Sequence, residues 1–163
     1  MRFVAIDPGT RHTGLAYMDD SHVIETKTFN FKESVGSDNS LLINRCVEIW
    51  KLLELYLEEH EHQAIVMEGF VPFPGAKNCS HQTPLLVGFL AGRILVNHQK
   101  LIIQTSSKVL NPRTRGNMAF AKSDMAEGRE VFPGCLLARN DHERSAIAHG
   151  MYFLANNKET PND

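Results

Sequence analysis

The stretch that decides the fold is RFVAIDPGTRHTGLAYM, residues 2–18. RFVAID is an apolar run that ends in a charged residue, and the turn residues Pro8 and Gly9 break it. HTGLAYM follows, and after a polar turn comes HVIETKTFNF, residues 22–31, where apolar and polar side chains alternate. Three strand-like segments joined this tightly predict an antiparallel meander.

The apolar pattern of the remaining chain extends this sheet and adds helices. Residues 41–57 repeat apolar side chains at helical spacing, and residues 64–67 form a short apolar strand after that helix. A strand reached through such a crossover normally joins the sheet in parallel. A largely apolar helix over 80–97, a fifth strand over 101–103 and a helix over 140–154 complete the pattern. We therefore expect an α/β fold with a five-stranded mixed sheet, antiparallel in its first three strands and parallel in its last two.

Composition indicates a globular protein. The chain has 163 residues, of which 42% are hydrophobic and 22% charged, so we expect one domain over residues 1–156 and a polar tail over 157–163. No apolar run approaches the roughly 20 residues that cross a bilayer, and we expect neither a signal peptide nor a membrane partner. Three cysteines without a C-x-x-C spacing are typical of a cytoplasmic protein with reduced thiols.

Basic residues gather in one segment. Residues 71–122 contain seven lysines and arginines and no aspartate or glutamate, although the net charge of the chain is −2. Contacts between Lys or Arg and phosphates dominate the affinity of proteins for nucleic acids. The segment therefore predicts a surface for a nucleic acid or another phosphate ligand. The alternative is a chance excess of basic residues on a solvated face.

Two carboxylates stand at the ends of strands. Asp7 lies where the first strand meets the Pro-Gly turn, and Glu68 directly follows the strand over 64–67. Active sites of open α/β sheets gather beyond the carboxyl ends of strands, and two adjacent carboxylates are unfavourable unless a proton or a cation lies between them. Oxygen ligands without a His/Cys cluster suit Mg²⁺ or Mn²⁺. The alternatives are a turn-forming Asp7 and a surface acid at Glu68.

A third acidic group opens the helix over 140–154, where Asp141 and Glu143 flank His142. Acids favour a helix N-terminus, so these residues could serve only to cap the helix. Alternatively, the helix crosses the sheet and brings its first turn to the two strand-end carboxylates, so that together they hold two metal ions for in-line phosphodiester hydrolysis. His149 shares a helix face with His142 and is expected to be a partly buried core residue.

These residues together give the sequence a family resemblance. VAIDPGTRHTG, residues 4–14, resembles the first-strand motif I-D-P-G-[ST]-x-x-T-G of RuvC-type Holliday junction resolvases, which belong to the RNase H-like superfamily. AIVMEGF, residues 64–70, is similar to the family's second catalytic strand. The segments AKN at 76–78 and SAIAHG at 145–150 also resemble family segments. The resemblance spans nearly the whole chain and implies an RNase H-like fold and a crossover junction endodeoxyribonuclease.

The resemblance also implies the metal ligands of a Mg²⁺-dependent enzyme, with Mn²⁺ able to substitute. The catalytic and metal-binding residues would be Asp7, Glu68, Asp141 and Glu143. The family ends in D-x-x-D or H-x-x-D, and alignment of the SAIA segment places Glu143 on the last acid but the neutral Asn140 on the first. Asp141 supplies that charge only if the register shifts by one residue. Asp141, His142 and Asn140 therefore stay open for the fourth ligand position.

DNA contacts and a dimer follow from the same resemblance. Lys108 and Lys122 fall where the family has basic residues near the active site, and aromatic residues in the loop after Glu68 suit stacking on bases or wedging between them. The predicted DNA-binding residues are Lys77, Lys108, Arg113, Arg115, Lys122, Phe70 and Phe73. The helix over 80–97 would form the interface of a two-fold dimer, because symmetric paired cuts call for two active sites. A buried core helix and aromatics that only pack their own loop are the alternatives.

The predicted function is the resolution of four-way DNA junctions by paired symmetric cuts. Two alternatives stay open: a relaxed-specificity nuclease for forked or flap DNA, and a branched-DNA-binding module that has lost catalysis. A phosphate-binding ATPase is disfavoured, because actin-like and sugar-kinase folds need two such domains in a longer chain. The compact chain and the divergent last motif fit a bacteriophage member of the family, which would act in the host cytoplasm.

Overall fold

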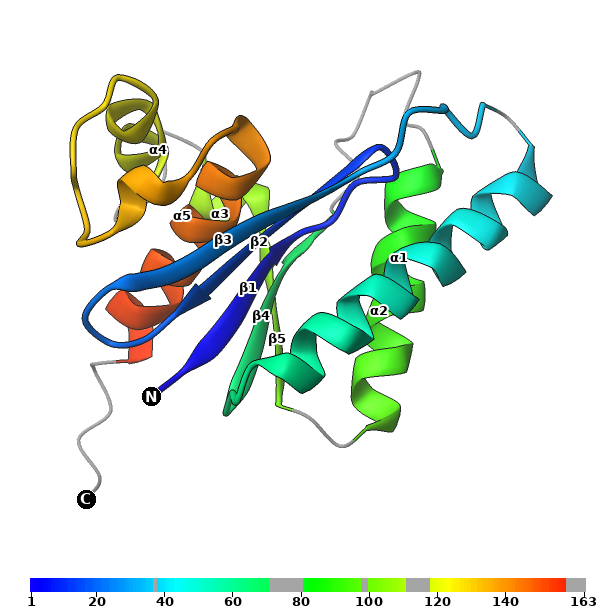
Figure 1. Ribbon diagram of the computed structural model, residues 1–163, viewed down its shortest axis with the longest axis horizontal. Coiled ribbons are helices and arrows are strands. Elements are labelled where there is room, and N and C mark those ends of the chain that lie inside the picture. Colours follow the sequence, from blue (N-terminus) through cyan, green and yellow to red (C-terminus); the bar gives the residue numbers. More distant parts are fainter. Residues whose placement is uncertain (37, 71–80, 98–99, 111–117, 158–163) are drawn as a thin grey trace.

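A five-stranded mixed sheet with the strand order β3-β2-β1-β4-β5 forms the centre of the fold (Figure 1). The computed structural model describes residues 1–36, 38–70, 81–97, 100–110 and 118–157. The strands are β1 (Phe3–Asp7), β2 (His12–Met18), β3 (Val23–Asn30), β4 (Ala64–Gly69) and β5 (Leu101–Thr105). β2 pairs antiparallel with β1 and β3, whereas β4 pairs parallel with β1 and β5. The predicted mixed sheet is confirmed.

Helices cover both faces of this sheet. α1 (Asn39–Glu59) and α2 (Gln82–Val96) pack on one face, and α5 (Asp141–Asn157) crosses the other (Figure 1). Three short elements lie between β5 and α5 in the chain, namely α3 (Ser106–Val109), α4 (Ala119–Ala126) and the 3₁₀ helix η1 (Cys135–Leu137). Within the described ranges, no helix has the length and apolar character needed to span a membrane.

The alternation of side chains along β1 divides the core into two layers. Val4 and Ile6 are buried in the layer beneath α1 and α2, whereas Phe3 and Ala5 are buried in the layer beneath α5. Successive side chains of a strand point to opposite faces of the sheet. Asp7, two residues beyond Ala5, therefore falls on the α5 face.

β4 follows the same division. Val66 is buried beneath α5 and Met67 beneath α1 and α2, so Glu68 again falls on the α5 face. Ile6 of β1 is opposite Met67 of β4 in the parallel register. The next residues along the two strands, Asp7 and Glu68, are therefore neighbours on one face of the sheet.

Glycines allow α5 to lie close to the sheet. Gly14 of β2 is opposite Asp7 in the antiparallel register, and a Cβ added at Gly14 would overlap the backbone carbonyl of His142. Further along α5, a Cβ added at Gly150 would overlap the sulfur of Met18. The missing side chain at Gly14 thus lets the first turn of α5 sit directly beside the end of β1.

Candidate active site

Asp7 and Glu68 form a pair of interacting carboxylates where β1 and β4 end. The side chain of Asp7 is 14% exposed and that of Glu68 is 21% exposed. The two side chains are close enough for each to change the proton affinity of the other. The structure thus brings together the two strand-end residues that the sequence singled out.

Two histidines of α5 approach this carboxylate pair. His142 Nδ1 lies 2.9 Å from Asp7 Oδ2, and His149 Nε2 lies 3.4 Å from Glu68 Oε2. Residues seven apart share one helix face, because seven residues make about two turns. His149 is completely buried, and its Nδ1 lies 3.2 Å from Oε1 of Gln104 in β5. One face of α5 therefore supplies an imidazole to each carboxylate.

These surroundings shift the pKa values of the two carboxyl groups in opposite directions. Burial raises the pKa of Asp7, the hydrogen bond with His142 lowers it and the charge of Glu68 raises it, which leaves the pKa at about 6. Burial also raises the pKa of Glu68, but the interactions with His149, 3.4 Å away, and with Asp7 outweigh burial and leave that pKa below its usual range. Without a cation, burial therefore favours the protonated form of Asp7 below about pH 6.

Glu143 points away from the carboxylate pair, contrary to the expectation that α5 presents it to the end of β1. Its buried carboxylate accepts hydrogen bonds from the hydroxyls of Thr26 and Thr28 in β3, at 3.1 and 2.7 Å, and from the Arg139 backbone N–H at 2.6 Å. Consecutive helix residues point about 100° apart, so Glu143 turns toward β3 while His142 faces β1. In this arrangement Glu143 anchors the first turn of α5 to the sheet.

Asn140, and not Asp141, caps α5. Asn140 Oδ1 accepts hydrogen bonds from the backbone N–H groups of His142 and Glu143, both at 3.0 Å. Asp141 is 67% exposed, and its carboxylate forms an ion pair of 2.8 Å with Lys122 of α4. Asp141 and Lys122 thus lie at the rim of the site, and the charge of Lys122 contributes to the lowered pKa of Glu68.

The donor set fits a hard divalent cation whose coordination is completed by water and substrate. Mg²⁺ is usually bound by one or two carboxylates together with substrate phosphates rather than by a cage of protein ligands. Asp7 and Glu68 supply such a pair, and the described part of the chain contains no group of three or more His, Cys, Asp or Glu side chains suited to hold a metal. A cation between these carboxylates would replace the proton that Asp7 holds.

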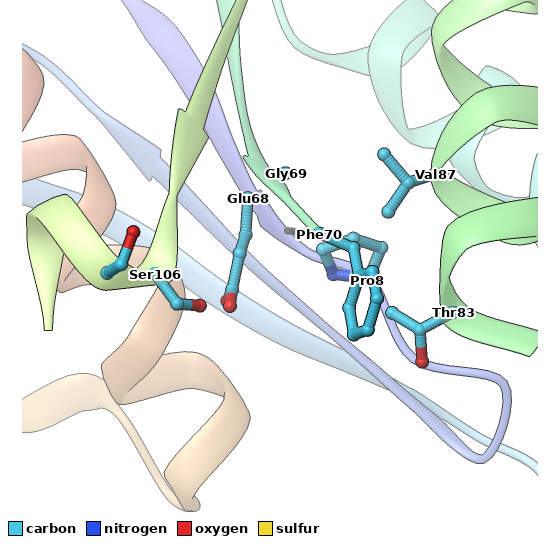
Figure 2. A pocket seen from close by; sticks show the side chains of 8 residues that line it. Pro8, Glu68, Gly69, Phe70, Thr83, Val87 and Ser106 are labelled. Atoms are coloured by element: carbon cyan, nitrogen blue, oxygen red, sulfur yellow. The ribbon is translucent and has the colours of Figure 1, made fainter. Parts of the chain in front are cut away.

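A pocket of about 210 Å³ opens beside Glu68 (Figure 2). In Figure 2, Glu68 lies between Ser106 on one side and Phe70 with Pro8 on the other. The residues that line the pocket are Pro8, Glu68, Gly69, Phe70, Thr83, Val87, Ser106 and Ser107. Phe70 is 37% exposed, so this predicted DNA-binding aromatic lies next to the carboxylate pair and remains accessible.

The predicted basic residues are described only in part. Lys122 adjoins the site through Asp141, and Lys108 is exposed on α3, the short helix that begins at the pocket residue Ser106. The predicted DNA-binding residues that lie outside the described ranges are Lys77, Phe73, Arg113 and Arg115.

Sequence reasoning identified some polar residues of the site and not others. The sequence leaves His142 open for the fourth ligand position and predicts His149 only as a partly buried core residue, whereas the structure buries His149 completely beside Glu68. The signal that could have identified His149 is its seven-residue separation from His142, since a helix that brings one residue to β1 brings the other to the same sheet face. No sequence signal pointed to the contacts of Thr26 and Thr28 with Glu143.

The five-stranded mixed sheet with helices on both faces is an RNase H-like fold, which solved Holliday junction resolvases share. No protein-family model and no curated protein matches the sequence. Among solved structures, Thermus thermophilus RuvC matches with a TM-score of 0.69 and 13% identity over 98% of both chains. The yeast mitochondrial Holliday junction resolvase Ydc2 gives a TM-score of 0.60 and 16% identity over 99% of this chain and 82% of its own. The fowlpox virus resolvase, solved in complex with Holliday junction DNA, matches with a TM-score of 0.57 and 12% identity over 96% of this chain and 98% of its own. The likeness confirms the predicted RNase H-like fold.

Proposed function

We propose that this protein is a metal-dependent endonuclease that resolves four-way DNA junctions. The observation that carries the proposal is the pair Asp7 and Glu68 at adjacent strand ends beneath α5, in a fold shared along the whole chain with RuvC. RuvC of T. thermophilus has also been solved with a Holliday junction substrate, which makes branched DNA the favoured substrate class. The domain that acts is residues 1–156.

Asp7 and Glu68 are the proposed ligands of Mg²⁺, for which Mn²⁺ can substitute. When bound, the cations supply the charge that activates water and stabilises the leaving 3′ oxygen. Asp7 interacts with both Glu68 and His142, so Asp7 would be the central ligand of the site. Glu68, ionised because of its lowered pKa, supplies a full negative charge at neutral pH.

His142 is the proposed third group of the site, in preference to Glu143. The His142 ring reaches Asp7 at 2.9 Å, whereas the Glu143 carboxylate is buried against β3. Asp141, exposed beside Lys122, is the second choice, because rotation of its side chain costs only a surface ion pair. Glu143 is proposed as a structural anchor of α5.

The DNA-binding surface is proposed to surround this site. Lys122 supplies positive charge at the site from α4, and Phe70 offers an accessible ring beside Glu68 for stacking on an unpaired base. Lys108 of α3 lies farther along α5, where it lines a second pocket with Tyr152 and Asn156, and would extend the surface in that direction. Lys77, Arg113, Arg115 and Phe73 belong to the same acid-free segment of the sequence and complete the proposed set.

A two-fold dimer through α2 is part of the proposal, since symmetric cuts need two sites. Gly88 and Gly92 are four residues apart on an exposed face of α2, and a Cβ at either position would meet open space. Leu85, Leu95 and Val96 flank them with exposed fractions of 38%, 57% and 70%. Glycines beside exposed apolar side chains favour close packing of a second helix, which supports an interface within residues 80–97.

The deciding experiment compares DNA substrates that differ only in their branching. We expect a synthetic four-way junction to be cut at symmetric positions with Mg²⁺ or Mn²⁺ and to stay intact with EDTA. Asp7→Asn should abolish cutting and still bind the junction, because the amide keeps the shape of the side chain without its charge. Equal cutting of forks and flaps would indicate a relaxed-specificity nuclease. Binding without cutting, with either metal, would indicate an inactive DNA-binding module.

A further inference from the structure

We propose that His149 is a positioning residue that sets the affinity of the site for its metal ion by fixing the Glu68 carboxylate. The inference rests on the proposed function only in taking Glu68 as a metal ligand. It concerns a residue that lies beneath the site and is inaccessible to substrate, because the side chain of His149 is completely buried.

The geometry places the imidazole between two strands. His149 projects from α5 onto the sheet, where Nε2 lies 3.4 Å from Glu68 Oε2 in β4 and Nδ1 lies 3.2 Å from Gln104 Oε1 in β5. Gln104 is opposite Glu68 in the parallel register, so the ring spans neighbouring residues of adjacent strands. Gln104 is itself buried, with 9% exposure. The three side chains form a row beneath the open side of the site.

The donors and acceptors of these three side chains determine which of them donates a hydrogen bond to which. A neutral imidazole donates from one ring nitrogen and accepts at the other, and a glutamine amide can turn either its oxygen or its nitrogen toward a partner. In the structure the Gln104 amide oxygen faces Nδ1 and can only accept from it. Turned over by about 180°, the same amide would donate its N–H to Nδ1, and the neutral His149 ring would then donate from Nε2 toward Glu68. Among the described residues, Nε2 is a buried nitrogen without a hydrogen-bond partner, and the Glu68 carboxylate lies 3.4 Å from it. A small movement of either side chain would let Glu68 satisfy it.

His149 occupies a fully buried position of a kind that apolar side chains usually fill. His149 lies in a helix segment whose neighbours Ala146, Ile147 and Ala148 are fully buried, and burial of a polar ring is unfavourable unless it is hydrogen-bonded. Side chains that hold a metal ligand from behind typically change metal affinity by about 10- to 100-fold. A fixed Glu68 carboxylate pre-organises the metal site in the same way.

The test measures Mn²⁺ binding to the full chain without DNA, by titration calorimetry. We expect His149→Leu to weaken Mn²⁺ binding by at least about tenfold, because the leucine fills the space and cannot donate. His149→Gln, which retains a donor, should restore most of the affinity. Ile147→Ala is the matched control, since it removes buried volume from the same helix without a polar contact; its Mn²⁺ affinity should equal that of the wild type.

A second pair of variants separates positioning from general damage. In a Glu68→Gln background, His149→Leu should have no further effect on Mn²⁺ binding, because the carboxylate through which it acts is gone. Wild-type affinity in His149→Leu, or an equal loss in the Glu68→Gln background, overturns the proposal. If His149→Leu does not fold, Gln104→Leu decides the question: several-fold weaker Mn²⁺ binding supports the proposal, and unchanged binding overturns it.

The outcomes also separate this inference from the proposed function. Mn²⁺ binding that depends on His149 in a protein that cuts no branched DNA supports the positioning role and contradicts the nuclease. Junction cutting together with Mn²⁺ binding that is independent of His149 supports the nuclease and contradicts the positioning role.

Discussion

His142 and Asp141 are adjacent in sequence and have different surroundings. His142 faces the end of β1 and contacts Asp7, whereas Asp141 lies at the rim and pairs with Lys122. The difference arises because consecutive residues of a helix point in different directions. It makes the two residues a natural pair for assigning the third group of the metal site.

We expect His142→Ala to lower the single-turnover rate of junction cleavage by about 10- to 100-fold, the range typical of groups that orient or complete a metal site. Asp141→Asn should change the rate by no more than about threefold, because an exposed ion pair contributes little. Both variants should keep wild-type stability in thermal unfolding. A larger loss in Asp141→Asn than in His142→Ala would transfer the ligand role to Asp141.

Protons should compete with the metal ion at Asp7. Its pKa is raised to about 6, and a carboxyl group must lose its proton to bind a cation. We expect the Mg²⁺ concentration for half-maximal cleavage to rise as the pH falls, by up to about tenfold per pH unit below about pH 6. The hydrogen bond with Asp7 raises the pKa of His142, so protonation of His142 adds to this rise at higher pH. A flat dependence between pH 5 and 7 would contradict the pKa assignment.

The same raised pKa has a consequence for stability without metal. Stabilisation from protonated Asp7 is fully present below about pH 4 and is lost as the pH rises through about 6, because the folded pKa exceeds the ordinary value of 3.8. Asparagine has no ionisable group, so the Asp7→Asn variant does not lose stability through ionisation at this position. It is the control for the pH experiment, and its melting temperature without metal should fall less than that of the wild type between pH 4 and 7.

Single residues of the site differed in how well the sequence predicted them. Asp7 and Glu68 were predictable, because an apolar strand that ends in an acid places that acid at the sheet edge whatever the remaining fold. Glu143 was not, because its role was inferred from alignment of the SAIA segment, and a helix position alone does not say whether a side chain faces β1 or β3. That choice depends on the rotation of α5, which tertiary contacts with Thr26 and Thr28 fix.

At the scale of elements, α5 links the two strand-end carboxylates, because it places one histidine beside each of them. The strands and the two long helices followed from their apolar residues: β1 and β4 are short apolar runs buried on both faces, whereas α1 and α2 repeat apolar residues at helical spacing. The docking of α5 depends instead on a missing side chain in another element, Gly14 of β2, next to Asp7 in the sheet. Such a contact between distant segments leaves no local pattern in the sequence.

We expect Gly14→Ala to lower cleavage by more than tenfold while costing about 1–3 kcal/mol of stability, the usual range for overpacking. The added methyl group would meet the backbone of His142, which cannot rotate away, so the first turn of α5 must shift. Gly150→Ala is the matched control: its methyl group would meet the flexible side chain of Met18. Similar destabilisation with retained cleavage in Gly150→Ala is expected. Wild-type cleavage in Gly14→Ala would show that cleavage does not depend on the close approach of α5 to β2.

At the scale of the whole molecule, the positive charge should govern DNA binding. We expect Lys108→Ala to reduce the slope of log affinity against log salt by about one for junction DNA, as one lost phosphate contact would. Lys51→Ala, on α1 at the opposite face of the sheet, is the control and should leave the slope unchanged. Equal slopes for both variants would exclude α3 from the DNA-binding surface.

The proposed dimer interface on the exposed face of α2 can be tested by substitution. Gly88→Gln should convert the protein to a monomer in light scattering, because the longer side chain keeps a second helix from approaching. Its junction cleavage should give single nicks rather than paired cuts. Leu137→Gln, at another exposed apolar position on η1, is the control and should remain dimeric. An unchanged dimer in Gly88→Gln would place the interface elsewhere.

Asp7 and His142 are 135 residues apart along the chain and in contact in the fold. A ribosome therefore releases β1, with its acid, long before α5 has been synthesised. Until then the strand-end acids have no imidazole beside them, and Glu68 has no partner from the helix that covers it. Synthesis thus keeps the two halves of the site apart in time. A partly made or prematurely terminated chain therefore lacks the two imidazoles that the complete site contains.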